Sequence, residues 1–387
     1  MRFGIVHSYY RNLEKSGENN VVDAQIKVLK SKGHDVAIFA SKYPEDKWPV
    51  SSMIRTGRNV VFGLGDNPAE SLREFNPEAI LLHNLFPNIS SNWLEEFGEI
   101  TFSFKHNYRD VCASANLYRN GSICMKCVEG SNLNALINRC YKDSMLMTSP
   151  IVVRNSLSMQ LRKDLRYPKK VLFLSDEMAR LHSTSGVPSE RCGVITNFVF
   201  DEYSDWNFSE KKNGRWVAVG RMVAEKGFME LLEVWPPGIE LDIFGDGPLL
   251  EKVEAASRQS PNVHIKGSIK REELSRLLPS YTGAVVPSRW FEPGALVILE
   301  FLSAGLPIVS MGIWSGAAGL NREWHLETES FDDNQSRSAL LALIEKVNTN
   351  KLELSLRQRQ KYLNSFTPDN WYQNLIEIMN SAGLKTK

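Results

Sequence analysis

The sequence lacks the features that mark several large classes of protein. Its 387 residues include 46 lysines and arginines and 45 aspartates and glutamates, so the formal net charge is only +1. Without a basic excess the chain has no bulk attraction for nucleic acid, and we expect no nucleic-acid partner. No internal repeat, no low-complexity tract and no Gly-x-Gly-x-x-Gly after the first predicted strand are found. The last absence argues against an oxidoreductase built on a nicotinamide-binding domain.

Two further absences concern the setting of the chain. No secretory signal is apparent, because residues 1–7 have the pattern of a first core strand. Cysteine is scarce, with five residues in the chain. In a chain without a signal this predicts a reducing, cytoplasmic environment.

The length and the 42% of hydrophobic residues are enough for two domains with separate cores. In the first half, strand-like runs alternate with a helical segment at residues 21–32, which Gly33 ends. This order predicts a parallel sheet covered by helices, the pattern of an α/β domain. The predicted strands of this half are residues 1–7, 35–40, 79–82, 100–104, 171–175 and 192–195.

The second half repeats the strand–turn–helix pattern and adds charge at a turn. A strand at residues 216–219 leads into Gly220–Gly227, which contains Arg221 and Lys226, and then into an apolar-periodic helix. Turns of this kind hold phosphate in α/β proteins, because ligands bind at the carboxyl ends of parallel strands. Arginine can donate two parallel hydrogen bonds to a diphosphate, and lysine adds a point charge.

Glycine also ends two later strands of this half. The strand at 241–244 stops at Gly245, and the strand at 263–266 stops at Gly267. Glycine at a strand tip lets a ligand approach the backbone closely. Three such turns in succession favour a ligand site more strongly than one turn would.

The most informative stretch is Pro287–Ser310, which contains Glu292 and Glu300 with seven residues between them. A helix is predicted over residues 295–304, and Pro293 has the fixed φ that suits a first turn. Glu292 would lie at the mouth of this helix, where free N–H groups attract phosphate. Glu300 would lie inside it, where a charge needs a partner. The arrangement suits a nucleotide sugar, with the diphosphate at the helix start and hydroxyl groups on either side.

Together these residues resemble a retaining glycosyltransferase of family 4, which has the GT-B architecture. The resemblance covers nearly the whole chain. It rests on residues 220–227, 244–249, 266–269 and 287–292 followed by Glu300, and on the histidine segments His83–Pro87 and His106–Arg109. Enzymes of this family move a sugar from a nucleotide diphosphate donor to an acceptor hydroxyl and retain the anomeric configuration.

The resemblance implies an α/β fold of two Rossmann-like domains facing each other across a cleft, with a C-terminal helix crossing back to the first domain. Residues 1–200 with helix 367–387 would form the acceptor-side domain, and residues 201–366 the donor-binding domain. The implied donor-binding residues are Gly17, Arg221, Lys226, Gly267, Gly294, Ala295, Leu296 and Glu300. The implied catalytic set is His106, Glu292, Arg221 and Lys226.

Each implied residue has a chemical role. Arg221 and Lys226 would stabilise the leaving diphosphate as its charge grows. Glu300 would bind the ribose hydroxyls, Glu292 the donor sugar, and His106 would face the sugar and the acceptor. No cofactor is expected for catalysis, because Asp-x-Asp, the metal-holding motif of the other major transferase architecture, does not occur. The expected acceptor is a saccharide or lipid-linked saccharide in surface polysaccharide assembly, such as O-antigen, capsule or exopolysaccharide.

Two loops depart from the family pattern. The usual Gly-Gly of the first loop is Ser16–Gly17, and the Gly-Phe-Gly or Gly-Phe-Pro after the first glutamate is Pro293–Ala295. Proline removes one N–H donor from the second loop. These changes keep open the alternative of a non-catalytic partner subunit on a glycosyltransferase fold.

Four of the five cysteines have the spacing C-x11-C-x2-C-x12-C. They are Cys112, Cys124, Cys127 and Cys140. A Cys-x-x-Cys pair with two outlying thiols is a pattern for structural zinc, with a local disulfide or buried free thiols as alternatives.

Histidines and a basic segment complete the candidates. His106 follows a predicted strand and can hydrogen-bond a sugar hydroxyl or phosphate, with a capping role as the alternative. For His83 and His7 we expect structural roles. Residues 154–170 are basic, with leucines at helical spacing. They predict either a solvated helix face or one that contacts an acceptor diphosphate or anionic lipid, peripherally on the inner face of the plasma membrane.

Overall fold

The computed structural model describes residues 1–9, 17–42, 50–206, 213–311, 325–326 and 334–384. The chain divides into two compact units. Each contains a six-stranded sheet, as the predicted α/β class requires. The first unit comprises residues 1–117, 124–197 and 371–387, and the second comprises residues 118–123 and 198–370. The grouping of residues 118–123 with the second unit was not anticipated from the sequence.

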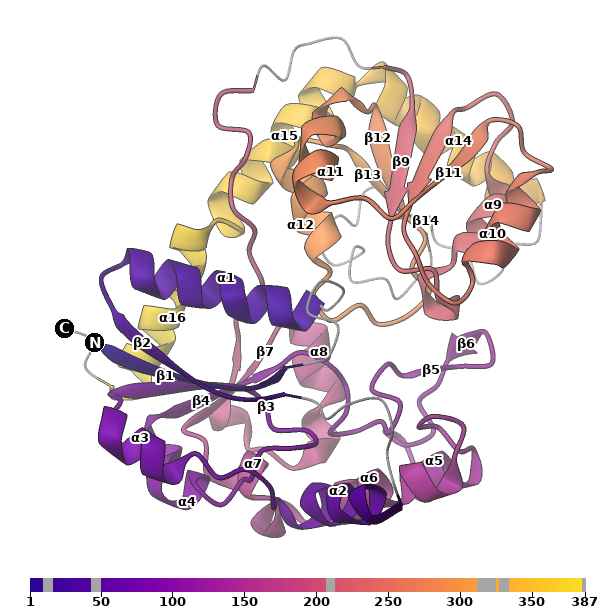
Figure 1. Cartoon of the computed structure of the whole chain (residues 1–387). Helices are drawn as coiled ribbons and strands as arrows, with labels where there is room; N and C mark the ends of the chain where they lie inside the picture. Colours follow the sequence, from indigo (N-terminus) through magenta and orange to yellow (C-terminus); the bar gives the residue numbers. More distant parts are fainter. Residues whose placement is uncertain (10–16, 43–49, 207–212, 312–324, 327–333, 385–387) are drawn as a thin grey trace. The chain divides into compact units, whose positions relative to one another are not determined.

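The first unit is built on a parallel sheet with the strand order β2-β1-β3-β4-β7-β8 (Figure 1). Its strands are β1 (Arg2–Tyr9), β2 (Asp35–Lys42), β3 (Ala79–Asn84), β4 (Thr101–Lys105), β7 (Lys170–Phe173) and β8 (Cys192–Val194). On one face, Val6, Ile80 and Leu82 pack in one cluster with Leu72 of helix α3 (Ala69–Phe75). Helix α1 (Gly17–Ser31) lies along the other face (Figure 1). Burial on both faces explains why these strands are nearly continuous apolar runs.

The remaining helices of this unit follow the strands or join them. They are α2 (Val50–Phe62), α4 (Leu94–Phe97), α5 (Leu133–Ile137), α6 (Met145–Ser156), α7 (Lys163–Arg166) and α8 (Asp176–Leu181). The C-terminal helix α16 (Pro368–Ser381) begins in the second unit and enters the first. There His34 Nε2 lies 2.7 Å from the Tyr372 hydroxyl, so the predicted return of the chain to the first domain is confirmed.

The helical character predicted for the basic segment 154–170 is wrong. It is not one helix, because α6 ends at Ser156 and α7 begins only at Lys163. Its guanidinium groups are also engaged: Arg154 and Arg162 both form ion pairs with Asp110, at 3.0 and 2.6 Å. A buried network of this kind stabilises the interior of the unit and leaves no free basic stripe.

The second unit is built on a parallel sheet with the order β11-β10-β9-β12-β13-β14. Its strands are β9 (Trp216–Val219), β10 (Leu241–Phe244), β11 (Val263–Gly267), β12 (Gly283–Val286), β13 (Ile308–Met311) and β14 (His325–Leu326). Its helices include α9 (Phe228–Val234), α10 (Leu250–Ser257), α11 (Arg271–Leu277), α12 (Leu296–Ser303), α14 (Asn334–Thr349) and α15 (Lys351–Ser365). Residues 118–123 form a small antiparallel hairpin of β5 (Tyr118–Arg119) and β6 (Ser122–Ile123).

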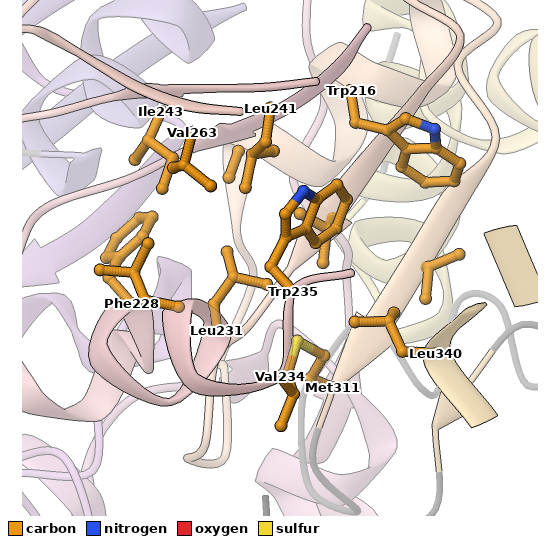
Figure 2. Packing of buried hydrophobic residues seen from close by; sticks show 14 of the residues in the cluster. Trp216, Phe228, Leu231, Val234, Trp235, Leu241, Ile243, Val263, Met311 and Leu340 are labelled. Atoms are coloured by element: carbon orange, nitrogen blue, oxygen red, sulfur yellow. The ribbon is translucent and has the colours of Figure 1, made fainter. Parts of the chain in front are cut away.

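Alternation along β9 gives this unit a core on each face of its sheet. Trp216 and Ala218 pack into the cluster with α9 and α14, whereas Val217 packs into the cluster with α11, α12 and α15. In the first cluster Trp216 meets Trp235 edge to face, with ring centroids 6.1 Å apart (Figure 2). These cores fix the strand order and therefore the position of every loop at the strand ends.

Candidate active site

The strand order of the second unit reverses between β9 and β12. From β9 the sheet continues to β10 on one side and to β12 on the other, so the carboxyl ends of these two strands form a topological switch point. Ligands of open α/β sheets bind outside the carboxyl ends of the strands at such a point. The loops that begin here contain Gly220–Gly227 and Pro287–Ala295, the two segments that the sequence analysis selected.

The two loops are held against each other by backbone contacts. The Arg289 N–H donates a hydrogen bond to the Glu225 carbonyl at 2.9 Å. Gly227 has a φ of +70°, and a Cβ at this position would lie 2.1 Å from the Pro287 carbonyl oxygen. Only glycine permits both the left-handed backbone and this close approach. The glycine that follows the lysine is therefore required by the packing of the loops.

The loops bring Lys226 and Glu292 together. The Lys226 ammonium lies 2.8 and 2.7 Å from the two carboxylate oxygens of Glu292, although the residues are 66 positions apart. The indole N–H of Trp290 also donates to this carboxylate at 2.8 Å, and the ammonium lies 5.4 Å from the indole ring centroid. Glu292 is only 8% exposed. The carboxylate is thus fixed in one orientation by two donors and a nearby ring.

Arg221 differs from Lys226 in that its side chain is exposed and makes no hydrogen bond or ion pair with any described residue. The backbone around it is fixed, because the Gly220 N–H donates to the Phe244 carbonyl at 3.0 Å. The end of β10 is joined to the end of β11 in the same way, because the Gly245 N–H donates a hydrogen bond to the Gly267 carbonyl at 2.8 Å. A Cβ at Gly267 would meet open space. The guanidinium is thus carried by a rigid turn without being engaged.

Glu300 lies on α12 with a different partner. Arg271 Nε approaches its carboxylate at 3.0 Å. Burial raises the pKa of Glu300, and the Arg271 charge opposes that rise. Glu300 and Arg271 line a small pocket together with Tyr203. Neither Lys226 nor Glu292 lines this pocket.

The start of α12 corrects one detail of the prediction. The first helical residue is Leu296 and the preceding cap is Ala295, so Pro293 lies before the helix and not in its first turn. Gly294, Ala295 and Leu296 therefore lie at the start of this helix, two to four residues after Glu292. The first N–H groups of the helix receive no side-chain cap.

The first unit has a cluster of histidines at its own switch point, where β1 and β3 end. His7 belongs to β1, His83 to β3, and His106 directly follows β4. His83 Nδ1 lies 2.9 Å from His106 Nε2, and the two rings stack with centroids 5.2 Å apart. The contact between His83 and His106 was not predicted from the sequence. The signal available was that each one lies where a predicted strand of the same sheet ends.

All three imidazoles are held in the neutral form. Burial lowers the pKa of His7, His83 and His106, in the last case to about 3, with the proximity of His7 and of the Lys105 ammonium adding to the effect. A neutral imidazole can donate from one ring nitrogen and accept at the other. At pH 7 the cluster can therefore hydrogen-bond a hydroxyl without adding a positive charge.

The start of α1 lies beside these histidines. Helix α1 begins at Gly17, four residues earlier than predicted, so Gly17 belongs to the helix and not to the preceding loop. Asn19 Oδ1 lies 3.0 Å from His7 Nε2, and Asn107 Nδ2 lies 3.5 Å from Glu18 Oε2. The structure thus brings Gly17 and His106 to the same end of one sheet.

The predicted zinc site is not assembled in this structure. Among the residues that the structure describes, no three histidine, cysteine, aspartate or glutamate side chains are arranged to hold a metal ion, and no cysteine forms a disulfide. The four thiols nevertheless share one region. Burial raises the pKa of Cys127 to about 11, with Cys112, Cys140 and Cys124 adding to the rise. Free thiols are the arrangement that the structure shows.

No helix in the described part of the chain has the length and apolar character needed to cross a bilayer.

Comparison with known proteins agrees with this geometry. Residues 200–363 match the family model described as Glycosyl transferases group 1. No curated protein matches the chain by sequence. A solved glycosyltransferase from Rickettsia africae matches with 13% identity and a TM-score of 0.62 over the whole of both chains.

Two further solved structures share the fold. WaaG, a glycosyltransferase involved in lipopolysaccharide biosynthesis, matches with 16% identity and a TM-score of 0.62 over the whole of both chains. Anabaena HepE in complex with UDP-glucose matches with 13% identity and a TM-score of 0.62, covering 98% of this chain and 100% of that one. The likeness confirms the GT-B fold, and the matched domain makes the chain a glycosyltransferase.

Proposed function

We propose that the chain is a retaining glycosyltransferase of family 4 that moves a sugar from a nucleotide diphosphate sugar to an acceptor hydroxyl. The observation that carries the proposal is the Lys226–Glu292–Trp290 arrangement at the β9/β12 switch point. It places a cation, a carboxylate and an aromatic surface at the position where α/β sheets bind ligands. The exposed Arg221 begins the same loop.

The cations of this loop would act on the diphosphate. When the bond between the sugar and the diphosphate breaks, negative charge grows on the leaving phosphate oxygens. Arg221 can donate to those oxygens without first leaving another partner, since it has none among the described residues. Lys226 would be shared between the phosphate and Glu292. A cation that is already positioned requires little reorganisation as the charge develops.

The two carboxylates would act on hydroxyl groups. Glu292 is oriented by Lys226 and Trp290, and its remaining acceptor capacity suits hydroxyls of the donor sugar. Glu300, which Arg271 approaches at 3.0 Å, would accept from the ribose hydroxyls. We assign acceptor binding to the first unit, where the neutral His106 and the start of α1 lie at one end of the sheet.

The donor and pathway are proposed by analogy with two of the structurally similar proteins. HepE was solved with UDP-glucose, and WaaB is named as a lipopolysaccharide outer core galactosyltransferase. We therefore propose a UDP-sugar as the first donor to test and bacterial surface polysaccharide assembly as the pathway. Retention of configuration rests on the family resemblance, and the anomeric coupling of the product in NMR decides it.

Transfer should not need a divalent metal, because Arg221 and Lys226 are proposed to offset the diphosphate charge. Donor turnover should continue in EDTA while circular dichroism shows an intact fold. Activity that disappears in EDTA and returns with magnesium or manganese would contradict this part of the proposal.

The decisive experiment is calorimetry of UDP, GDP and ADP binding to the purified protein and its variants. Arg221→Ala should weaken the preferred diphosphate by about 10- to 100-fold, because a charge-assisted hydrogen bond contributes ~1.5–3 kcal/mol. His106→Ala should leave that affinity nearly unchanged and lower turnover. Arg258→Ala, which removes an exposed arginine elsewhere in the second unit, is the matched control.

Unchanged diphosphate binding in Arg221→Ala would show that the donor is not held by this loop. Donor binding without any turnover, across a panel of acceptors, would favour the non-catalytic partner subunit instead.

A further inference from the structure

One face of the first unit exposes large apolar side chains that no part of the proposed site uses. We call it the α2–α6 face. It consists of Ile54 and Phe62 on α2, Leu133 and Ile137 on α5, and Met145, Leu146 and Val153 on α6. Several are largely uncovered, with Phe62 65%, Leu146 68% and Ile137 72% exposed. Single exposed apolar residues are ordinary, but a group of this size marks an interaction surface.

The three helices are neighbours in the fold. Helix α6 contacts both α2 and α5, and in Figure 1 the three labels follow one edge of the first unit. The exposed side chains have helical spacing: Ile54 and Phe62 are eight positions apart on α2, and Leu133 and Ile137 are four apart on α5. The apolar groups therefore form stripes on adjoining helices.

The charge around these stripes is almost entirely positive. Arg55, Arg58, Arg139 and Lys142 are exposed, and Asp143 is the only acidic residue within α2 and residues 131–156. Arg55 and Arg58 make no ion pair with any described residue. Arg154, the remaining base of these segments, is engaged by Asp110 and Asp164.

A cavity opens between α2 and α6. Its lining includes Ile54, Val60, Phe86, Leu146 and Pro150. Lys142 also lines it. An apolar cavity with a cation among its lining residues suits an acyl chain whose phosphate group remains at the surface.

We propose that the α2–α6 face docks this protein on an anionic phospholipid bilayer, with the apolar stripes entering the headgroup region and the four cations contacting lipid phosphates. A second copy fits less well, because a two-fold contact through this face would bring like charges together. This surface is distinct from residues 154–170, for which the sequence also predicted contact with anionic lipid, because the guanidinium groups of that segment are engaged. The proposal does not depend on the glycosyltransferase activity.

The test is co-sedimentation of the full chain with vesicles of phosphatidylcholine, with and without phosphatidylglycerol. We expect binding to the anionic vesicles and weakening by salt. Arg55→Glu with Arg58→Glu should reduce the partition coefficient at low salt by at least about 30-fold, since each lost cation corresponds to roughly a fivefold change. Ile54→Glu with Leu146→Glu should abolish binding.

The matched controls are double variants of the second unit in which exposed basic residues or exposed leucines are likewise replaced by glutamate. Lys252→Glu with Arg258→Glu gives the same change in net charge, and Leu277→Glu with Leu352→Glu changes two exposed leucines. Both controls should bind as the parent chain does. The proposal is overturned if the parent chain does not bind anionic vesicles, or if the face variants bind as well as the controls.

Hydrogen exchange of the unmodified chain keeps the test independent of variant folding. On anionic vesicles, α2, α5 and α6 should gain protection while α9 and α10 should not. If only helices outside the α2–α6 face gained protection from hydrogen exchange, this face would be rejected as the docking surface. A parent chain that is dimeric in gel filtration, and becomes monomeric through Ile54→Glu with Leu146→Glu, would assign the face to a second copy and overturn the proposal.

Discussion

At the carboxyl ends of its strands the first sheet carries two buried imidazoles and one half-buried imidazole, whereas the second carries an ion pair and an exposed guanidinium. Both sheets are parallel, and both candidate sites lie where the strand order reverses. The backbone arrangement is therefore shared and the electrostatics are not. His7, His83 and His106 are kept neutral by burial, while Lys226 and Glu292 keep opposite charges together.

The comparison shows how one fold can support two kinds of recognition. A diphosphate needs cations, and the second sheet supplies them on a turn that glycine allows to pack closely. A saccharide hydroxyl needs donors and acceptors without net charge, and the neutral imidazoles offer both. Side chains on a few strand-end residues decide this difference, whereas the sheets themselves need not change.

The largest expected effect is on the charged site. Lys226→Met should lower donor turnover by about 10²- to 10³-fold, because it removes a cation placed where charge develops and leaves Glu292 without its counter-ion. Steady-state kinetics with the preferred donor measure this. Lys252→Met, an exposed lysine of the same unit, is the control and should be unaffected. A variant that retains turnover within threefold or so of the parent would separate the ion pair from catalysis.

A smaller effect is expected on stability, from the packing that supports the charged site. Gly227→Ala and Gly238→Ala both place a Cβ on a left-handed backbone, at φ of +70° and +80°, but only the first meets a neighbouring carbonyl. Gly238→Ala should cost about 1–2 kcal/mol and Gly227→Ala clearly more. Urea unfolding gives both values. Equal costs would show that the two loops can separate without penalty.

The neutral site should respond to pH. In the unfolded chain the histidine pKa is near 6.5, and burial lowers it in the folded state, to about 3 for His106. As pH falls below 6.5 the unfolded state binds more protons, so the free energy of unfolding decreases, by up to about 1.4 kcal/mol per pH unit for each histidine.

This slope should be shallower in His106→Gln than in the parent chain, measured by urea unfolding between about pH 5 and 6.5, above the ordinary carboxylate range. Identical slopes would mean that His106 titrates alike in both states, and the assignment of a buried neutral imidazole would fail.

The smallest expected effect on function concerns the cysteines. Metal analysis of protein purified without a histidine tag should show roughly one zinc per chain if the four thiolates close a tetrahedral site. Removing that metal should leave nucleoside diphosphate affinity unchanged, because the proposed donor residues Arg221, Lys226 and Glu300 belong to the other unit. Protein with no zinc and four titratable thiols would reject the site and agree with the free thiols of the structure.

Local signals in the chain were enough to predict the elements that carry the charged site. The strand at 216–219, the Gly220–Gly227 turn and the helix around Glu300 all follow from short-range periodicity and glycine placement. Boundaries were less well predicted where a helix start had no strong cap, so α1 begins at Gly17 and not at residue 21. The helical character of segment 154–170 was predicted wrongly, because its leucines keep helical spacing across a break between two helices.

Alone, the sequence determined the α/β class, the two-domain organisation and the identity of the charged residues, because these depend on local periodicity and turn chemistry. Only the tertiary structure decided which polar side chains meet. Lys226 pairs with Glu292, Arg271 with Glu300, and His83 with His106. The physical reason is that such pairs depend on strand order and on helix packing against a sheet, which bring distant positions together and leave no periodic trace in the chain.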